Sequence, residues 1–482
     1  VRHVLESRDR VMIIRGVAGT GKTTLEQEIG EALAEAGKPV VGLAQSAKAS
    51  REVLRQQAGF ATADTVAMFF KDERMQESAR DGVILVDEAS QLGTRDMHQL
   101  FELADGLNAR VLLVGDRRQH RSVTAGEPLK LLEQNAGIKV AAVTEILRQK
   151  GDYKKAAQAL SEGHVYEAFE ELDKLGWIKQ APSNDRYRQL ADAYLSAVAE
   201  KKGDKHKTAL VVSPTHAEGH KITEAIRDGL KGKSKLKKER VVKAWVTGHL
   251  TDSDKGDRTQ YEPGDLIQFH QNAKGFTKGA RLIVRDGEQV PTELANRFEL
   301  YRPVELALAV GDRVRITAGG KTKDGKHRLS NGSLMTVQGF TSRGDIIVDH
   351  GWVIDHDFGH LTHGYVVTSH ASQGATVDKV FVGISSESLP ATHQRTGYVA
   401  FTRGKEKVEI YTDDRKELLR ALSRPDEPVS ATELAQLTEP KIKGRRQRMK
   451  ALARGNAGFG AQQIETARTQ DAAAQRGLDH DR

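Results

Sequence analysis

A glycine-rich stretch near the start of the chain, GVAGTGKTT at residues 16–24, has the residue types and spacing that bind phosphate. Glycines let the backbone turn tightly around the anion, the lysine reaches the outer phosphates, and the next hydroxyl can hold Mg²⁺. An apolar run precedes the stretch and a helical pattern follows it, which would place phosphate at a helix N-terminus. The alternative is a glycine-rich turn that ends in Lys-Thr by chance. The predicted ATP contacts are Gly16, Gly19, Thr20, Gly21, Lys22, Thr23 and Thr24.

An acidic pair follows a second apolar run, in the sequence ILVDEAS at residues 84–90. Asp87 is suited to hold Mg²⁺ together with Thr23, and Glu88 to orient or deprotonate an attacking water. The alternative is an acidic turn after a core strand. A third run ends in VGDRRQ, where Gln119 is predicted to sense the γ-phosphate, although Gly-Asp after a strand is also an ordinary turn. Together these residues predict nucleotide hydrolysis as well as binding.

The arrangement of apolar segments indicates how these residues are positioned. Up to about residue 230, apolar strands alternate with helical stretches, which predicts a parallel sheet with helices on both faces. Residues 263–284 and 310–337 share a plan of Gly-Asp, alternating apolar residues, a basic glycine-rich turn and another strand, which predicts two related small β-barrel units. The α/β pattern then returns, so the β region is predicted to be an insertion in a second α/β domain. The polar, basic tail from about residue 421 is predicted to be an exposed helix or disordered.

Composition limits the classes of function. Among 482 residues, 74 Lys and Arg against 66 Asp and Glu give a net charge of +8, which fits a polyanionic partner or a solvated basic surface equally well. The absence of cysteine excludes disulfides, thiol catalysis and thiolate metal sites. No apolar run has the length of a membrane span and no signal-peptide pattern opens the sequence, so a cytoplasmic protein without membrane insertion is predicted. Because the first residue is Val1, we expect a piece of a longer polypeptide.

Seven motifs occur in an order that matches a known family. They are GVAGTGKTT, DEAS, VGDRRQHRSVTAG, EILRQ, VVSPTHAEGHKITEAIR, VVTSHASQGATVDKVFVG and YVAFTRGKEKVEIYTD. In these motifs the chain resembles superfamily 1 helicases of the RecD-like 5′→3′ class, and most closely the helicase region of MobF-type conjugative relaxase-helicases. The resemblance covers residues 1 to about 415. His120 and Thr124 depart from the family, which tends to have leucine and an acid there.

The resemblance implies an α/β fold of two RecA-like domains with parallel sheets, a small β-barrel insertion in the second, and ATP with Mg²⁺ between them. It implies that Arg148 and Arg403 reach the γ-phosphate, where a guanidinium stabilises the charge on the transferring group, and that Gly374 lines the same cleft. A surface salt bridge is the alternative for each arginine. The implied parts are 1–143 for the first domain, 144–235 and 361–420 for the second, 236–360 for the insertion and 421–482 for the tail.

The resemblance also implies contacts with single-stranded DNA. The residues concerned are Ser46, Lys48, Thr65, Thr215, His216, Ser369 and His370. Taken alone, His370 is equally a core histidine. Phe69 and Phe70 are candidates either for a strand-splitting pin or for the core. The basic turns of the two β units are candidates for phosphate contacts or are solvated hairpin tips.

The predicted function is that of an ATP-dependent translocase and 5′→3′ helicase acting on single-stranded and tailed duplex DNA. The chain is expected to be the helicase part of a conjugative relaxase, with an upstream relaxase domain and the conjugation machinery as further partners. Three alternatives remain open: a non-catalytic DNA-binding module of a relaxase, a RecD-like repair helicase, and a P-loop ATPase that acts on protein complexes. DNA-stimulated ATP turnover separates the helicase prediction from the first and third.

Overall fold

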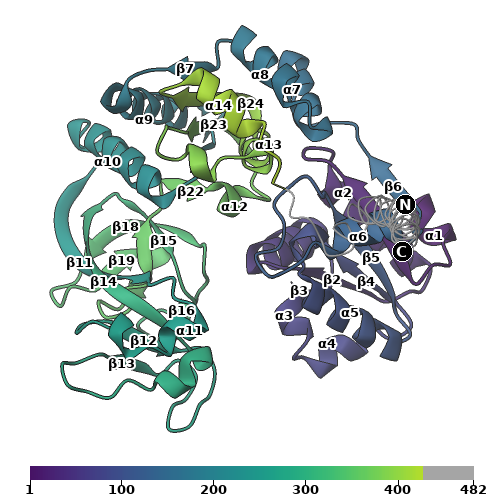
Figure 1. Cartoon of the computed structure of the whole chain (residues 1–482), viewed down its shortest axis with the longest axis horizontal. Coiled ribbons are helices and arrows are strands. Elements are labelled where there is room, and N and C mark those ends of the chain that lie inside the picture. The colour runs from purple at the N-terminus through teal and green to yellow at the C-terminus, as the bar shows by residue number, and fades with distance from the viewer. Residues whose placement is uncertain (427–482) are drawn as a thin grey trace, which may run out of the picture. The chain divides into compact units, whose positions relative to one another are not determined.

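The computed structural model describes residues 1–426, apart from the side chains of residues 183 and 184 (Figure 1). The predicted polar tail therefore lies almost wholly outside the described residues, which end shortly after α14 (Arg415–Leu422). Within residues 1–426, no helix combines the length and the apolar character needed to cross a membrane.

The first sheet has six parallel strands in the order β3-β2-β4-β5-β1-β6. Alternate residues of a strand face opposite sides. Ile13 accordingly packs in one apolar cluster, whereas Met12 and Ile14 pack in another. The strands are β1 (Val11–Gly16), β2 (Val40–Ala44), β3 (Thr62–Thr65), β4 (Val83–Val86), β5 (Arg110–Gly115) and β6 (Val140–Val143). The accompanying helices are α1 (Arg2–Glu6), α2 (Lys22–Glu35), the π-helix η1 (Ala49–Gln57), α3 (Val66–Phe69), α4 (Glu73–Glu77), η2 (Ala89–Gln91), α5 (Thr94–Gly106) and α6 (Pro128–Asn135).

The second sheet has five parallel strands in the order β22-β10-β23-β24-β7. Val380 and Val382 pack in one core cluster and the intervening Phe381 in another, so this sheet is also covered on both faces. Helices α9 and α10 pack against each other (Figure 1). The strands are β7 (Ile178–Gln180), β10 (Ala209–Ser213), β22 (Val366–Thr368), β23 (Val377–Gly383) and β24 (Gly404–Thr412). The helices are α7 (Gly151–Glu162), α8 (Val165–Lys174), α9 (Ser183–Ala199), α10 (His216–Gly232), α12 (Ser369–Ser372), η6 (Leu389–Ala391), α13 (Gln394–Phe401) and α14.

Antiparallel sheets occupy the chain between α10 and β22. One has the order β11-β14-β12-β13 and the other β20-β19-β18-β15-β21. Each predicted repeat supplies an antiparallel pair, β12 with β13 and β15 with β18. The strands are β11 (Lys237–Thr247), β12 (Leu266–Phe269), β13 (Arg281–Ile283), β14 (Phe298–Val310), β15 (Arg313–Ile316), β18 (Leu334–Phe340), β19 (Ile346–Val348), β20 (Val353–Ile354) and β21 (Leu361–His363). Shorter elements are the pairs β8 (Lys201–Lys202) with β9 (Lys205–His206) and β16 (Gly320–Lys321) with β17 (Arg328–Leu329), together with α11 (Asp252–Lys255), η3 (Arg258–Gln260), η4 (Thr292–Arg297) and η5 (Asp349–Gly351).

Parallel pairing determines where the chemical motifs of the first sheet meet. Strands β1, β4 and β5 are hydrogen-bonded in the order β4-β5-β1 and run in the same direction. The GKTT, DEAS and GDRRQ motifs each follow the carboxyl end of one of these strands. Three motifs far apart in the sequence therefore lie at one edge of the sheet, where ligands bind in α/β folds.

Candidate active site

The predicted phosphate-binding loop connects β1 to α2. Gly19 and Gly21 have φ angles of +87° and +78°, a region that favours glycine. A Cβ atom at Gly16 would lie 2.7 Å from Cγ of Lys22, and one at Gly19 would lie 2.9 Å from Cβ of Arg148. Gly21 precedes α2 without a side-chain cap, and the first turn of the helix has no acidic residue. The first N–H groups of α2 are thus available to an anion.

Lys22 is a buried cation without a hydrogen bond. Its side chain is 14 % exposed, its Nζ atom has no hydrogen-bond partner, and the Oε1 atom of Glu88 is 3.7 Å away. Burial lowers the pKa of Lys22, but Glu88 and Asp87 outweigh this, so the pKa lies above its ordinary value. A charged, unpartnered ammonium beside the loop fits a site that receives phosphate.

The acidic pair lies at the end of β4. Glu88 has a φ of +51°, a left-handed conformation that costs a non-glycine residue energy and that is concentrated at functional sites. Its N–H donates to Oδ1 of Asp87 at 2.7 Å, and its own Oε2 accepts from Nε2 of Gln373 at 3.0 Å. Burial, followed by the charge of Glu88, raises the pKa of Asp87 to about 6. The half-buried Thr23 lies in the first turn of α2, so a hydroxyl and a carboxylate suited to Mg²⁺ are both present.

Glu26 is a third buried carboxylate at this site, which the sequence analysis did not identify. It is fully buried, and its pKa is raised well above the usual value by burial first and then by Asp87. Its position four residues after Lys22 on a helix was the available signal, because such residues share a helix face.

Tyr398 of α13, which the sequence did not single out, connects two of the predicted ATP motifs, namely the phosphate-binding loop and the segment that begins with Gly115-Asp116. Its hydroxyl accepts a hydrogen bond from the N–H of Ala18 at 2.8 Å and donates to Oδ2 of Asp116 at 2.7 Å. Gln119, which is 1 % exposed, donates from Nε2 to the same Asp116 oxygen at 3.3 Å. A residue of the YVAFTRG motif thus touches both the phosphate-binding loop and the segment that carries Gln119.

The two predicted γ-phosphate arginines lie near each other. The Nη1 atom of Arg148 donates to the carbonyl of Thr402 at 2.7 Å, and its backbone N–H donates to the carbonyl of Gly19 at 3.1 Å. Arg403 is 2 % exposed and donates from Nε to the carbonyl of Val399 at 2.8 Å. Burial, and next the charge of Arg403, lower the pKa of Arg148 to about 9; burial also lowers the pKa of Arg403, while Glu88 opposes this.

Neither guanidinium forms an ion pair with a carboxylate of residues 1–426. The half-buried Arg148 and the buried Arg403, two neighbouring cations without a carboxylate partner, fit an anionic ligand better than the surface salt bridge that was the alternative. Gly374, which directly follows Gln373, has a φ of +77° and open space where a Cβ atom would be.

The predicted DNA contacts on the first sheet follow neighbouring strands. Ser46 and Lys48 are exposed after β2, and Ser46 Oγ accepts from the N–H of Ala49. Thr65 ends the adjacent β3 and caps α3 by accepting from the N–H of Met68 at 3.2 Å. Phe69, by contrast, is buried in the core and Phe70 packs against the same cluster, so both serve the core of the first unit.

The predicted DNA contacts on the second sheet differ from one another in their exposure to solvent. Thr215 caps α10. Part of the neighbouring His216 is exposed to solvent, and its pKa lies below the ordinary value because the ring is partly desolvated and because Arg315 is near. Ser369 is 3 % exposed, and its Oγ atom lies 2.8 Å from Nε2 of His120. The exposed His370 stacks on His120 at 3.7 Å between ring centroids. The buried member of this pair is therefore His120, whose pKa burial lowers to about 2.

Two residues of the basic turns have partners within the insertion. Phe276, the aromatic residue of the first turn, stacks on the core residue Phe269 at 4.2 Å between centroids. In the second turn, Lys323 donates to Oδ1 of Asp345 at 2.6 Å. These two residues thus stabilise the insertion itself.

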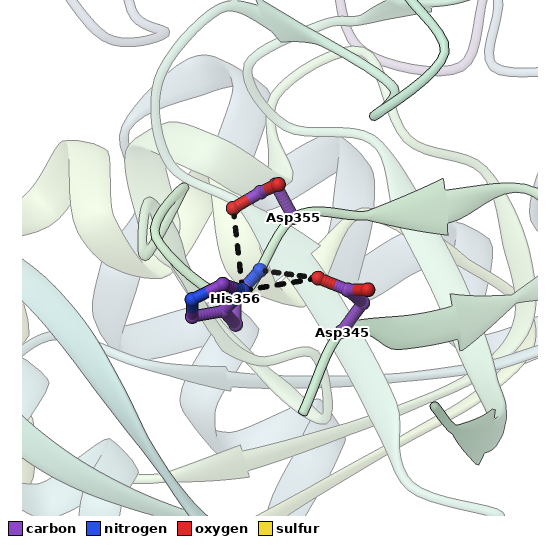
Figure 2. A group of neighbouring side chains, drawn as sticks. All are labelled: Asp345, Asp355 and His356. Carbon is purple, nitrogen blue, oxygen red and sulfur yellow. Dashed lines mark hydrogen bonds and ion pairs between the residues drawn. The ribbon is translucent and has the colours of Figure 1, made fainter. Parts of the chain in front are cut away.

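A second group with metal-ligand chemistry lies in the insertion and consists of Asp345, Asp355 and His356 (Figure 2). Asp345 accepts from His356 Nδ1 at 3.0 Å, and Lys323 Nζ lies 3.3 Å from Asp355. Hydrogen bonds from Lys323 first, and then from His356, hold the pKa of Asp345 well below its usual range. Lys323 and the ring of His356 already contact both carboxylates, so the group acts as a structural tie between β19, β20 and the β16–β17 hairpin.

Comparison with known proteins identifies relatives of both halves of the chain. A family model described as an AAA domain matches residues 1–183, and one described as the viral superfamily 1 RNA helicase core domain matches residues 340–412. The multifunctional conjugation protein TraI of Escherichia coli K12 is 24 % identical over 86 % of this chain and 27 % of its own length. The ATP-dependent RecD2 DNA helicase of Deinococcus radiodurans is 32 % identical over 32 % of this chain and 22 % of its own length. The chain thus spans about a quarter of the length of these relatives.

A solved structure, the Pif1 helicase from Bacteroides in complex with ADP-AlF3 and single-stranded DNA, shares the fold. It aligns over 91 % of this chain and 96 % of its own, with a TM-score of 0.50 and 16 % identity.

Proposed function

We propose that the chain is a superfamily 1 helicase related to the relaxase-helicases, and that it moves 5′→3′ along single-stranded DNA and unwinds duplex DNA at the expense of ATP. The observation that carries the proposal is the set of cations around Glu88, none of which has a hydrogen bond to a carboxylate of residues 1–426. Lys22 lies at the end of the phosphate-binding loop. Arg148 lies shortly before α7, and Arg403 lies between α13 and β24, so both belong to segments next to the second sheet. ATP bound there would touch both sheets.

Each residue of the set has a defined role in the proposal. Lys22 and the N–H groups at the start of α2 hold the outer phosphates. Thr23 and Asp87 hold Mg²⁺, which supplies positive charge to the phosphate oxygens. Glu88, held by Gln373 at 3.0 Å, accepts the proton of the attacking water.

The two arginines act on the transferring group. Arg148 and Arg403 donate to phosphate oxygens as negative charge develops there, which stabilises the transition state more than bound ATP. Gln119 senses whether the γ-phosphate is present. Tyr398 transmits the resulting change in the ATP site to the second sheet through its hydrogen bonds to Asp116 and Ala18.

DNA movement requires that both sheets contact the strand. We propose that Ser46, Lys48 and Thr65 do so on the first sheet, and Thr215, His216, Ser369 and His370 on the second. Because Ser369 Oγ is engaged by His120 in this structure, its contact with DNA requires a rearrangement of that bond. Phosphate contacts dominate such binding, since they do not depend on the base.

The finer organisation of the chain belongs to the same proposal. We infer a first RecA-like domain at 1–143, a second at 144–235 and 361–420, and a β-barrel insertion at 236–360 made of the two antiparallel sheets. The similarity to TraI, named as a multifunctional conjugation protein, supports a place as the helicase part of a conjugative relaxase, with the relaxase domain and the conjugation machinery as partners.

A strand-displacement assay tests the direction of movement. The full chain is incubated with Mg²⁺, ATP and a duplex that carries either a 5′ or a 3′ single-stranded tail, and the Lys22→Ala protein serves as the blank. Release of the strand from the 5′-tailed duplex alone is the expected result. A preference for the 3′ tail would overturn the polarity, and displacement of neither would overturn the unwinding activity.

A further inference from the structure

Glu26 is an acidic residue on the buried face of α2, where apolar side chains are expected. The other glutamates of α2, which are Glu28, Glu31 and Glu35, are exposed, as expected for the solvent side of an amphipathic helix. Glu26 instead is fully buried together with Ile29 and Leu33. A carboxylate at such a position requires a compensating partner, because burial of an unpaired charge is strongly unfavourable.

No hydrogen-bond donor among residues 1–426 meets this requirement. Neither Oε1 nor Oε2 of Glu26 has a hydrogen-bond partner, and both atoms are shielded from solvent. The residue that its carboxylate approaches is another carboxylate, that of Asp87, and Lys22 is the nearby cation. The ammonium of Lys22 is itself without a hydrogen bond. Two acceptor groups facing each other need a proton or a cation between them.

The charges around this point favour a divalent cation. Lys22 is the cation that acts on both Glu26 and Asp87, whereas Arg148 and Arg403 act on Glu88. Glu88 and Asp116 also attract the ammonium of Lys22, so Glu26 and Asp87 share one positive charge with two further carboxylates. Oxygen atoms of carboxylates and hydroxyls are the ligands that Mg²⁺ and Mn²⁺ prefer. Thr23, three residues before Glu26, supplies the hydroxyl on the same helix face.

We propose that Glu26 is an additional carboxylate of the divalent-cation site, acting beside Asp87 either on the ion or on its bound water. The inference rests on the proposed function, since Thr23 and Asp87 are the Mg²⁺ residues proposed above. It goes further in one respect: with this extra carboxylate, the protein binds a divalent cation before any nucleotide arrives.

The competing explanation is that Glu26 stays protonated and donates a hydrogen bond to Asp87. Glutamine distinguishes the two, because its amide has nearly the same shape and can donate to Asp87 but carries no negative charge. Leucine removes the polar group altogether and is expected to fold, since it replaces an unpartnered buried carboxylate with an apolar side chain.

The test measures Mn²⁺ binding to the full, nucleotide-free chain from the electron paramagnetic resonance signal of free Mn²⁺. We expect the unmodified protein to bind one ion, and Glu26→Gln and Glu26→Leu to weaken this binding about tenfold or more, the range seen when a supporting group of a metal site is removed. Asp87→Asn is expected to weaken it as well. Glu28→Gln, two residues away on the exposed face, is the matched control and should bind as the unmodified protein does.

Two results would overturn the proposal: no Mn²⁺ binding without nucleotide, or unchanged binding by Glu26→Gln, which would assign Glu26 the role of a neutral hydrogen-bond donor. Circular dichroism of each variant verifies its fold. ATP turnover with single-stranded DNA is measured on the same preparations. A nucleotide-free Mn²⁺ site in a protein without DNA-stimulated turnover would contradict the helicase function and leave the role of Glu26 standing.

Discussion

Two acidic clusters of the molecule have nearly the same composition and opposite character. Near the first sheet, Asp87 and Glu88 lie close to Lys22. In the insertion, Asp345 and Asp355, drawn in Figure 2, lie close to Lys323. Asp87 and Asp345 are similarly shielded, at 7 % and 3 % exposed, although the side chains of Lys323 and Asp355 are more exposed than those of Lys22 and Glu88. A further difference is in the pairing of the charges.

The lysine of each cluster shows this difference. Nζ of Lys22 lies 3.7 Å from the nearest Glu88 oxygen and has no hydrogen bond, whereas Nζ of Lys323 donates to Asp345 at 2.6 Å. The carboxylate of Asp345 also accepts from Thr341 Oγ1 and from the backbone and ring of His356. A satisfied cluster stabilises a fold, whereas an unsatisfied one marks a place where a ligand completes the set of interactions.

The largest effect is expected when the lysines are exchanged for alanine. Lys22→Ala should reduce ATP turnover to the background level, because a charge that contacts the reacting phosphates is lost. Its affinity for single-stranded DNA without nucleotide should stay within a few fold. Lys323→Ala should leave turnover nearly unchanged. Steady-state ATPase assays and DNA titrations of the two folded proteins make the comparison, and a strong ATPase defect in Lys323→Ala would show that the clusters are not functionally distinct.

The next effect concerns the unpaired guanidiniums beside Glu88. Arg148→Ala and Arg403→Ala should each lower kcat by about 10³-fold with little loss of ATP affinity, because their contacts strengthen in the transition state. Arg420→Ala, which breaks an exposed pair with Glu417, is the matched control and should leave kcat unchanged. Single-turnover kinetics together with nucleotide binding separate the two quantities. An unchanged kcat would assign that arginine to the structure rather than to the chemistry.

A smaller effect, on stability alone, is expected in the insertion. Asp345→Asn should lower the free energy of unfolding by about 1 kcal/mol, because it removes a charged acceptor from several hydrogen bonds. Urea unfolding, followed by the fluorescence of Trp352 and the other tryptophans, measures the loss. ATP turnover should not change under native conditions; a lost turnover with unaltered stability would reverse the roles given to the two clusters.

The smallest effect is a pH dependence at His356. Its hydrogen bond to Asp345, followed by the charge of Asp357, raises its pKa above the ordinary value, so the folded protein binds this proton more tightly than the unfolded chain. The stabilisation is complete below the unfolded pKa of about 6.5 and disappears as the pH rises through the raised folded value. The difference in unfolding free energy between the unmodified protein and His356→Gln should shrink over that window. A difference that grew with pH would show the opposite sign of coupling.

Local spacing was sufficient to predict much of the site and the fold. The GKTT and DEAS motifs follow apolar strands whose alternation with helices predicts parallel sheets, and parallel strands bring their carboxyl ends to one edge. Arg148 and Arg403 are different, because only the family resemblance singled them out among 74 basic residues.

The contacts between distant segments could not be predicted in this way. Tyr398 and Asp116 are 282 positions apart, and His120 and Ser369 are 249 apart, so no local pattern relates them. Glu26 was missed for another reason. In the sequence it is one of several glutamates of a polar helix, and its position four residues after Lys22 does not by itself indicate that it is buried.

ATP turnover of the full chain, measured with and without single-stranded DNA and with Lys22→Ala as the blank, tests the central claim most directly. The cations around Glu88 come from segments next to both sheets, so DNA held across those sheets should alter the arrangement of the ATP site. We predict slow turnover without DNA and a clear increase with it, absent from the Lys22→Ala protein. Turnover that is the same with and without DNA, or that survives in Lys22→Ala, would contradict the account.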